Sequence, residues 1–170
     1  SRELGAAKGL MLSIQKNLPG LIDLMAKKIW PLVCPSVSQV PQTFLKGEYG
    51  LVAVMAHTRQ AEFIRLFRSI FKTTILDPAP LFPGMKSSGI PKEIADLTGV
   101  NYALPSEQEL LEYFGTDDEA AGVPRFFSHG GGGVVLKKGS SGSVFFKGPN
   151  TAGAPLPVYP VEDPIDVTGA

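Results

Sequence analysis

Short apolar runs alternate with amphipathic segments after residue 48, and this alternation predicts strands and helices in turn. Residues 51–55 form a continuous apolar run of the kind typical of a strand covered on both faces. Residues 73–76 predict the next strand. Between them Thr58 is placed to cap a helix. The apolar face of that helix is expected to hold Phe63, Leu66, Phe67, Ile70 and Phe71. Strand, helix and strand so close together predict a βαβ unit with parallel strands.

The same alternation continues towards the carboxyl end. A helix is predicted from Pro91 to Gly99, a strand over 100–104, and a helix over 107–114 that stops at Gly115. Residues 134–138 and 144–147 predict two strands joined across residues 139–142 as a hairpin, and 155–161 a last extended stretch. The acidic segment 117–119 is expected to be a solvated face or a helix start. Repeated alternation of this kind predicts a layered α/β architecture.

The first 48 residues differ from the rest and are treated as a separate, unassigned segment. Residues 1–30 carry helical apolar stripes broken at Pro19-Gly20, and residues 31–48 predict an extended connection rich in proline. The chain begins with Ser1 rather than methionine, so we expect a processed or truncated start. We therefore divide the chain into residues 1–48 and a domain over 49–170.

Charge and cysteine content narrow the classes of function. Sixteen basic and sixteen acidic residues among 170 give a formal net charge of zero, which argues against a nucleic-acid-binding surface. The longest apolar run is far shorter than the roughly 20 residues that span a bilayer. Cys34 is the single cysteine, so an internal disulfide is excluded and a structural role is expected. The lack of disulfides favours a reducing compartment, so we expect a cytoplasmic protein. The balanced charge and the short apolar runs predict that it binds neither nucleic acid nor membrane.

Several isolated polar residues have an ordinary structural explanation. His57 lies just beyond a strand, where α/β proteins bind ligands, but a surface or helix-start position is the simpler interpretation. His129 has no evident partner, and Asp77 is expected to cap a strand end. Residues 130–133 predict a flexible linker, because no Lys-Ser/Thr pair follows as in a phosphate-binding P-loop. The arginines that recur at helical spacing predict a solvated face: Arg59, Arg65 and Arg68.

The carboxyl end carries the most specific motif. Residues 158–161, followed by Asp166-Val-Thr-Gly-Ala170, resemble the strand and Asp-Thr-Thr-Gly-Ala-Gly-Asp helix start of the PfkB (ribokinase-like) carbohydrate kinases. The resemblance implies an anion hole begun by Gly169 and Ala170. It also places Asp166 and Thr168 beside the nucleotide. The family's catalytic Asp would lie two positions beyond Ala170, and Val167 departs from the family's first Thr.

Three further segments resemble the same family in the same order. The run from Val134 to Gly142 resembles its strand and Gly-x-x-Gly turn, which implies nucleotide contacts at Gly139 and Gly142. Residues 104–109, Leu-Pro-Ser-Glu-Gln-Glu, resemble its Pro-Asn-Glu-x-Glu segment, which implies that Glu109 lies near magnesium although Ser106 replaces the Asn. Ser106 and Glu109 also fit a capping box, and the two roles are compatible. Residues 75–78, with Asp77-Pro78, resemble a strand end of the family.

The resemblance covers about residues 50–170 and implies an incomplete ribokinase-like three-layer sandwich with a mostly parallel sheet. It further implies a kinase that uses ATP and Mg²⁺ to phosphorylate a sugar or related alcohol. The family's Gly-Gly-x-x-x-Asn sugar-binding segment is not found, so this chain by itself is expected to be inactive. The alternative is a kinase-derived scaffold without activity. A cut parallel sheet would expose an apolar edge, which suggests a homodimer or a subunit of a larger assembly.

Overall fold

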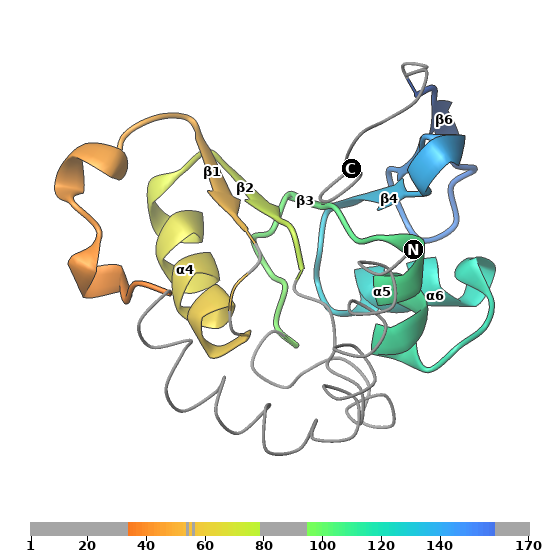
Figure 1. The fold of residues 1–170 in the computed structure, drawn as a ribbon, viewed down its shortest axis with the longest axis horizontal. Coiled ribbons are helices and arrows are strands. Elements are labelled where there is room, and N and C mark those ends of the chain that lie inside the picture. The colour runs from red at the N-terminus through yellow and green to blue at the C-terminus, as the bar shows by residue number, and fades with distance from the viewer. Residues whose placement is uncertain (1–33, 54, 56, 79–94, 159–170) are drawn as a thin grey trace, which may run out of the picture.

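The computed structural model describes residues 34–53, 55, 57–78 and 95–158, which contain one six-stranded sheet flanked by helices (Figure 1). The strands lie side by side in chain order, from β1 to β6. The sheet is parallel from β1 to β4 and antiparallel from β4 to β6. Its strands are β1 Tyr49–Val52, β2 Thr73–Leu76, β3 Tyr102–Ala103, β4 Gly133–Lys137, β5 Ser143–Phe146 and β6 Ala154–Leu156. The α-helices of the described residues are α4 His57–Ile70, α5 Glu107–Phe114 and α6 Glu119–Ser128.

The βαβ unit predicted from the apolar pattern is confirmed, and its helix packs through part of the predicted apolar face. Helix α4 connects the parallel strands β1 and β2. Its buried residues are Gln60, Ala61, Phe63 and Ile64. Ile70 is 39% exposed, so its predicted place on the buried face is wrong. Thr58 lies within the first turn instead of preceding the helix as a cap. Of the predicted face, Phe63 and Phe71 are buried and Phe67 packs against the core. The buried face also includes Gln60 and Ala61, which the apolar pattern left out.

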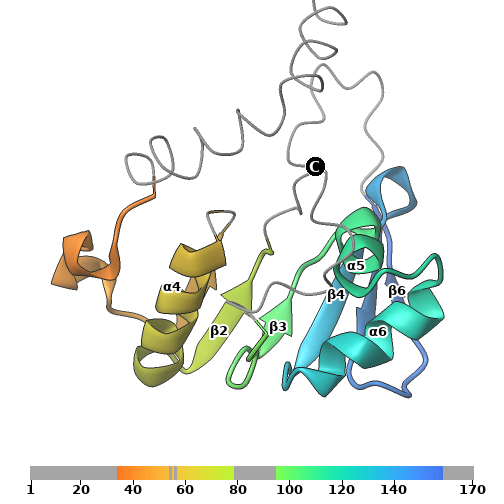
Figure 2. The ribbon, with the colours of Figure 1, turned by 90° about the horizontal axis from the view of Figure 1, so that it is seen from below.

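Strand β1 is not covered on both faces, contrary to the prediction. It spans Tyr49–Val52 and ends before Met55. Val52 is buried, whereas Tyr49 and Leu51 are 69% and 55% exposed. Figures 1 and 2 show α4, α5 and α6 on the same side of the sheet. Since alternate residues of a strand face opposite sides, the side chains of β1 that point away from these helices remain in contact with water.

The segment before β4 is more closely packed than a flexible linker. Gly133 belongs to β4 and pairs with Tyr102. The Gly132 N–H donates to the Val100 carbonyl at 2.9 Å. A Cβ atom at Gly132 would lie 2.5 Å from the backbone oxygen of Asn101. The prediction of a linker over 130–133 is therefore wrong, because these glycines allow β4 to approach the chain beside β3.

The short strand β3 replaces the longer one predicted over 100–104. Only Tyr102 and Ala103 are paired as strand. The helix predicted from Pro91 to Gly99 is not seen over residues 95–98, and its earlier part lies outside the described residues. Leu97, expected to face inward, is fully buried. The backbone turns at Gly99, where φ is +85°.

Helices α5 and α6 pack against each other beside β4. Ser106 caps α5 and Gly115 ends it in the left-handed conformation, as predicted. Asp118 caps α6, which confirms the helix start expected at 117–119. The rest of α6 was not predicted, because Gly122 and Pro124 both disfavour helix. Gly122 is needed for packing, since a Cβ atom there would lie 3.1 Å from Leu110 Cγ.

The carboxyl-terminal strands confirm the predicted hairpin. Strands β4 and β5 are antiparallel neighbours, with Val134 opposite Phe146. Residues 154–156 add β6 to this hairpin and overlap the start of the stretch predicted to be extended over 155–161. Residues 159–161 of that stretch lie outside the described residues. The connection over 31–48, predicted to be extended, holds two 3-10 turns, Val37–Gln39 and Gln42–Phe44. Cys34 is buried at its start. No helix in the described part of the chain is long and apolar enough to cross a membrane.

Candidate functional site

Polar side chains gather where the parallel strands end. Asp77 directly follows β2, Ser106 follows β3 after two intervening residues, and Lys137 ends β4. Because these strands are parallel, their carboxyl ends meet at one edge of the sheet. Open α/β sheets bind ligands beyond this edge. We therefore take the carboxyl edge of β2, β3 and β4 as the candidate site.

An ion pair spans this edge above the end of β3. Lys137 Nζ lies 2.9 Å from Asp77 Oδ1, so the contact links β2 to β4 across the strand between them. Both side chains are partly exposed, at 36% for Lys137 and 28% for Asp77. The Lys137 backbone N–H donates to the Pro105 carbonyl at 2.9 Å. Asp77 was expected to cap its strand; its side chain instead accepts a hydrogen bond from a lysine sixty residues later in the chain.

Ser106 and Glu109 form the predicted capping box at the start of α5. The Ser106 N–H donates to Glu109 Oε2 at 2.7 Å, and the Glu109 N–H donates to Ser106 Oγ at 3.2 Å. Both bonds satisfy backbone groups that a helix start leaves without partners. The helix cap therefore holds the Glu109 carboxylate at the carboxyl edge. Its role near magnesium stays a prediction. Within the described ranges, no group of three or more acidic, His or Cys side chains is arranged to hold a metal.

The turn from Gly139 to Gly142 follows β4 at the same edge. It is a short 3-10 turn closed by the Gly142 N–H, which donates to the Gly139 carbonyl at 3.0 Å. Both glycines have positive φ, +55° and +85°. A Cβ atom at Gly139 would meet nothing within 4 Å, whereas one at Gly142 would lie 2.5 Å from the Leu156 carbonyl oxygen. Gly139 thus faces open space and Gly142 packs against β6. Nucleotide contact at either glycine stays a prediction.

The carboxyl-terminal motif does not enter this description. The predicted nucleotide residues Asp166 and Thr168 lie outside the described residues, as do Gly169 and Ala170 of the predicted anion hole. The structure therefore brings together Asp77, Glu109 and the glycine turn at one edge.

Two buried polar residues at this edge were not singled out from the sequence. The Gln60 side chain is fully buried, and its Nε2 donates to the Ala53 carbonyl at 3.1 Å and to the Asp77 carbonyl at 2.9 Å. It therefore joins the ends of β1 and β2. Tyr113 is also buried, and its hydroxyl lies 3.4 Å from His57 Nε2. A glutamine on the buried stripe of a helix was the available signal for Gln60.

His57 and His129 both have contacts that their surroundings in the sequence did not predict. His57 is the first residue of α4, as the simpler interpretation held, and it reaches Tyr113. Burial raises the pKa of Tyr113, and the negative charges of Glu109 and Asp77 add to this rise. The prediction that His129 lacks a partner is wrong, because its Nδ1 lies 2.9 Å from the Ala95 carbonyl oxygen.

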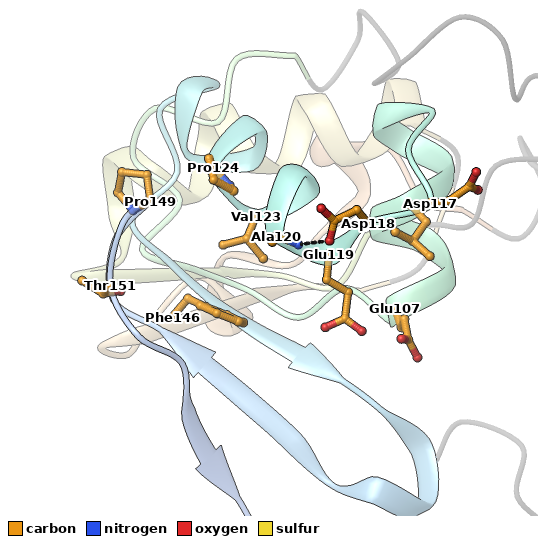
Figure 3. Close-up of a pocket in the computed structure, with 11 residues that line it drawn as sticks. Glu107, Asp117, Asp118, Glu119, Ala120, Val123, Pro124, Phe146, Pro149 and Thr151 are labelled. Atoms are coloured by element: carbon orange, nitrogen blue, oxygen red, sulfur yellow. Dashed lines mark hydrogen bonds between the residues drawn. The ribbon is translucent and has the colours of Figure 1, made fainter.

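A hollow of about 580 Å³ lies between the helices α5 and α6 and the strand β5. Figure 3 shows Glu107 and Glu119 in it, with Phe146 of β5 nearby. Lys138 Nζ lies 2.7 Å from Glu119 and 3.9 Å from Glu107. Hydrogen bonding with Glu119 raises the pKa of Glu107, and the charge of Glu119 adds to this rise. The hollow therefore carries more negative charge than one lysine neutralises.

Of the three arginines predicted to form a solvated face, Arg65 is exposed and the other two make ion pairs at the surface. Arg59 contacts Glu62 on its own helix at 2.7 Å. Arg68 contacts Asp96 at 3.3 Å and donates to the Thr98 carbonyl at 3.2 Å. Thr98 hydrogen bonds and Arg68 lower the pKa of Asp96. These contacts lie away from the carboxyl edge and have a structural role.

Comparison with solved structures identifies the fold. A ribokinase of Arabidopsis thaliana, solved with ribose and ATP, superposes with a TM-score of 0.57 at 22% identity over 84% of this chain. A ribokinase of Giardia lamblia gives a TM-score of 0.57 at 19% identity over 76% of the chain. The chain has the ribokinase-like fold. A PfkB protein of Polaromonas sp. JS666 matches at a TM-score of 0.56, with 16% identity over 75% of the chain.

The likeness to ribokinase-like and PfkB structures concerns part of their length. The chain spans 44%, 42% and 46% of the Arabidopsis, Giardia and Polaromonas chains. No protein-family model and no curated protein sequence matches it. The mostly parallel sheet with helices, predicted from the sequence, is confirmed.

Proposed function

We propose that this chain is part of an ATP-dependent phosphotransferase that phosphorylates a hydroxyl group of a sugar or related small molecule. The observation that carries the proposal is the glycine turn, Gly139–Gly142, at the carboxyl edge of a ribokinase-like sheet. One neighbour of this fold was solved with ribose and ATP, and another, a nucleoside kinase of Burkholderia thailandensis, with inosine. The substrate class is proposed from these ligands.

The residues at the edge fit a bound nucleotide. Gly139, Ser140 and Ser141 are exposed, and open space next to Gly139 leaves the backbone free for a ligand to approach. Close approach to backbone is one reason for glycine at such positions. We propose that Gly139 and Gly142 shape this contact. Asp166 and Thr168 would contribute to the same binding, and the N–H groups of Gly169 and Ala170 would begin the anion hole.

Magnesium would arrive with the phosphate groups of the nucleotide. Mg²⁺ is commonly held by one or two carboxylates together with substrate phosphates and water. The capping box fixes one carboxylate, Glu109, at this edge, which fits such a shared site. When bound, the ion neutralises charge on the transferred phosphoryl group. Glu109 would orient the ion or its waters.

The experiment measures ATP binding and phosphoryl transfer separately. Isothermal titration of the chain with Mg²⁺-ATP should show binding that Gly139→Val weakens, because the side chain fills the space beside the turn. Gly115→Val, at another positive-φ glycine that ends a helix, is the matched control. The chain alone should transfer no phosphate, because the proposed Asp base is not among its residues. Absence of ATP binding to the folded chain would reject the proposal.

A catalytically inactive scaffold is the second candidate, and one observation favours it. Ser106 stands where the family resemblance implies Asn, and its backbone and hydroxyl are both used by the helix cap. A cap of this kind needs no metal. The residues encoded after Ala170 separate the two candidates. Gly-Asp at that point supports the kinase, and replacement of the Asp supports the scaffold.

A further inference from the structure

Two consecutive lysines at the end of β4 contact carboxylates on opposite sides of the sheet. Lys138 lies between Glu119 and Glu107, on the side of α5 and α6. Lys137 contacts Asp77. Alternate strand residues face opposite sides, and Lys137 shares the side of Val135, opposite the buried Val134 and Leu136. Figures 1 and 2 show α4, α5 and α6 on the other side.

The two ammonium groups differ in how firmly they are held. Hydrogen bonding with Glu119 raises the pKa of Lys138, and the charges of Glu119 and Glu107 add to this rise. Among the described residues Lys137 contacts one carboxylate, at 2.9 Å, and both partners of that pair are partly exposed. Ion pairs in such positions contribute little to stability. Lys137 is therefore the lysine that can exchange its partner at low cost.

Lys137 is also the better placed of the two for a ligand at the carboxyl edge. Its backbone N–H donates to the carbonyl of Pro105, which follows β3 by two residues, so the carboxyl end of β4 is held in place. The open space at Gly139 begins two residues later. A phosphate group carries more charge than a carboxylate and forms strong charge-assisted hydrogen bonds with lysine. It would therefore compete successfully with Asp77.

We propose that Lys137 is an anion-binding residue whose ammonium group is occupied by Asp77 until a phosphate group of a ligand displaces the carboxylate. The proposal deepens the proposed function, on which it rests for the identity of the ligand as a nucleoside triphosphate. Asp77 then acts as a competing internal anion that lowers affinity for the ligand. This role has the opposite sign to that of a metal-binding or substrate-binding carboxylate, whose removal would weaken binding.

The test measures the affinity of the chain for inorganic triphosphate and for ATP by isothermal titration. Asp77→Asn should tighten binding of both ligands about two- to fivefold, because the carboxylate of this partly exposed pair no longer competes for the Lys137 ammonium group. Lys137→Met should weaken both about tenfold. The double variant should equal Lys137→Met, because Asp77 acts only through Lys137. Lys137→Arg should retain binding. Lys138→Met, on the other side of the sheet, is the matched control and should leave affinity within about twofold.

The outcomes separate the inference from the proposed function. Unchanged or weaker binding by Asp77→Asn, with native circular dichroism, overturns the inference. Triphosphate that binds neither the original chain nor Asp77→Asn overturns it as well. If neither the Lys137 nor the Asp77 substitutions change the affinity for ATP, the inference is overturned and the kinase proposal stays intact. If the variants change triphosphate affinity as expected but the chain binds ATP no more tightly than inorganic triphosphate, the inference is supported and the assignment of the ligand as a nucleotide is rejected.

Discussion

Gln60 offers the sharpest test of how the carboxyl edge is held together. Its side chain is fully buried and donates two hydrogen bonds, to the carbonyls of Ala53 and Asp77 at 3.1 and 2.9 Å. These carbonyls follow β1 and β2. Leucine has nearly the same volume but no donor, so Gln60→Leu removes both bonds with little change in packing. The substitution tests hydrogen bonding rather than cavity formation.

The expected loss follows from the number of bonds and their burial. A buried hydrogen bond contributes about 0.5–1.5 kcal/mol net, and an acceptor left unpaired costs about 1–3 kcal/mol. Part of this loss is offset because leucine is more apolar than glutamine. We expect Gln60→Leu to lower the free energy of unfolding by about 2–4 kcal/mol.

Urea unfolding followed by far-ultraviolet circular dichroism measures this difference. The control is Gln108→Leu, which removes an exposed bond between Gln108 and Glu112 on α5. We expect that control to change stability by less than about 0.5 kcal/mol. If Gln60→Leu is as stable as the control, the two bonds do not hold β1 and β2 together and the reasoning is refuted.

Three further predictions concern the turn, the acidic hollow and the sheet edge. Gly142→Ala should lower the free energy of unfolding by about 2–4 kcal/mol, because φ is +85° and the new Cβ would lie 2.5 Å from a backbone oxygen. Gly139→Ala, where a Cβ meets nothing within 4 Å, should lower it by about 1 kcal/mol. Equal losses of stability for the two variants in urea unfolding would contradict this. Glu107→Gln should raise the melting temperature at pH 7. The raised pKa of the Glu107 carboxyl means that the folded state binds this proton more tightly than the unfolded state does. The folded state is therefore destabilised as the pH rises through that pKa, and glutamine, which does not ionise, avoids this loss. The gain should vanish below about pH 4, and a gain confined to acidic pH would reverse the argument. Leu51→Lys, at a 55% exposed position on edge strand β1, should reduce any self-association seen by light scattering at high concentration, and unchanged association would place the contact elsewhere.

The sequence by itself determined the elements whose cause is local. The capping box of Ser106 and Glu109 and the stop at Gly115 depend on residues within one helix, and both were predicted where they occur. The hairpin across residues 139–142 also depends on neighbouring residues. The order of strand, helix and strand then predicted a mostly parallel sheet, because parallel neighbours require a connection that crosses over.

The tertiary structure decided what depends on residues distant in the chain. The ion pair between Asp77 and Lys137 joins residues sixty positions apart, and no local pattern places them together. Gln60 was not singled out from the sequence, because its partners are backbone carbonyls, which every residue carries. Strand β1 had the composition of a fully covered strand, yet Tyr49 and Leu51 are exposed because burial depends on which layers pack against a strand. Local periodicity fixes which face of an element is apolar, but only the packing of distant elements decides which faces are covered and which charges meet.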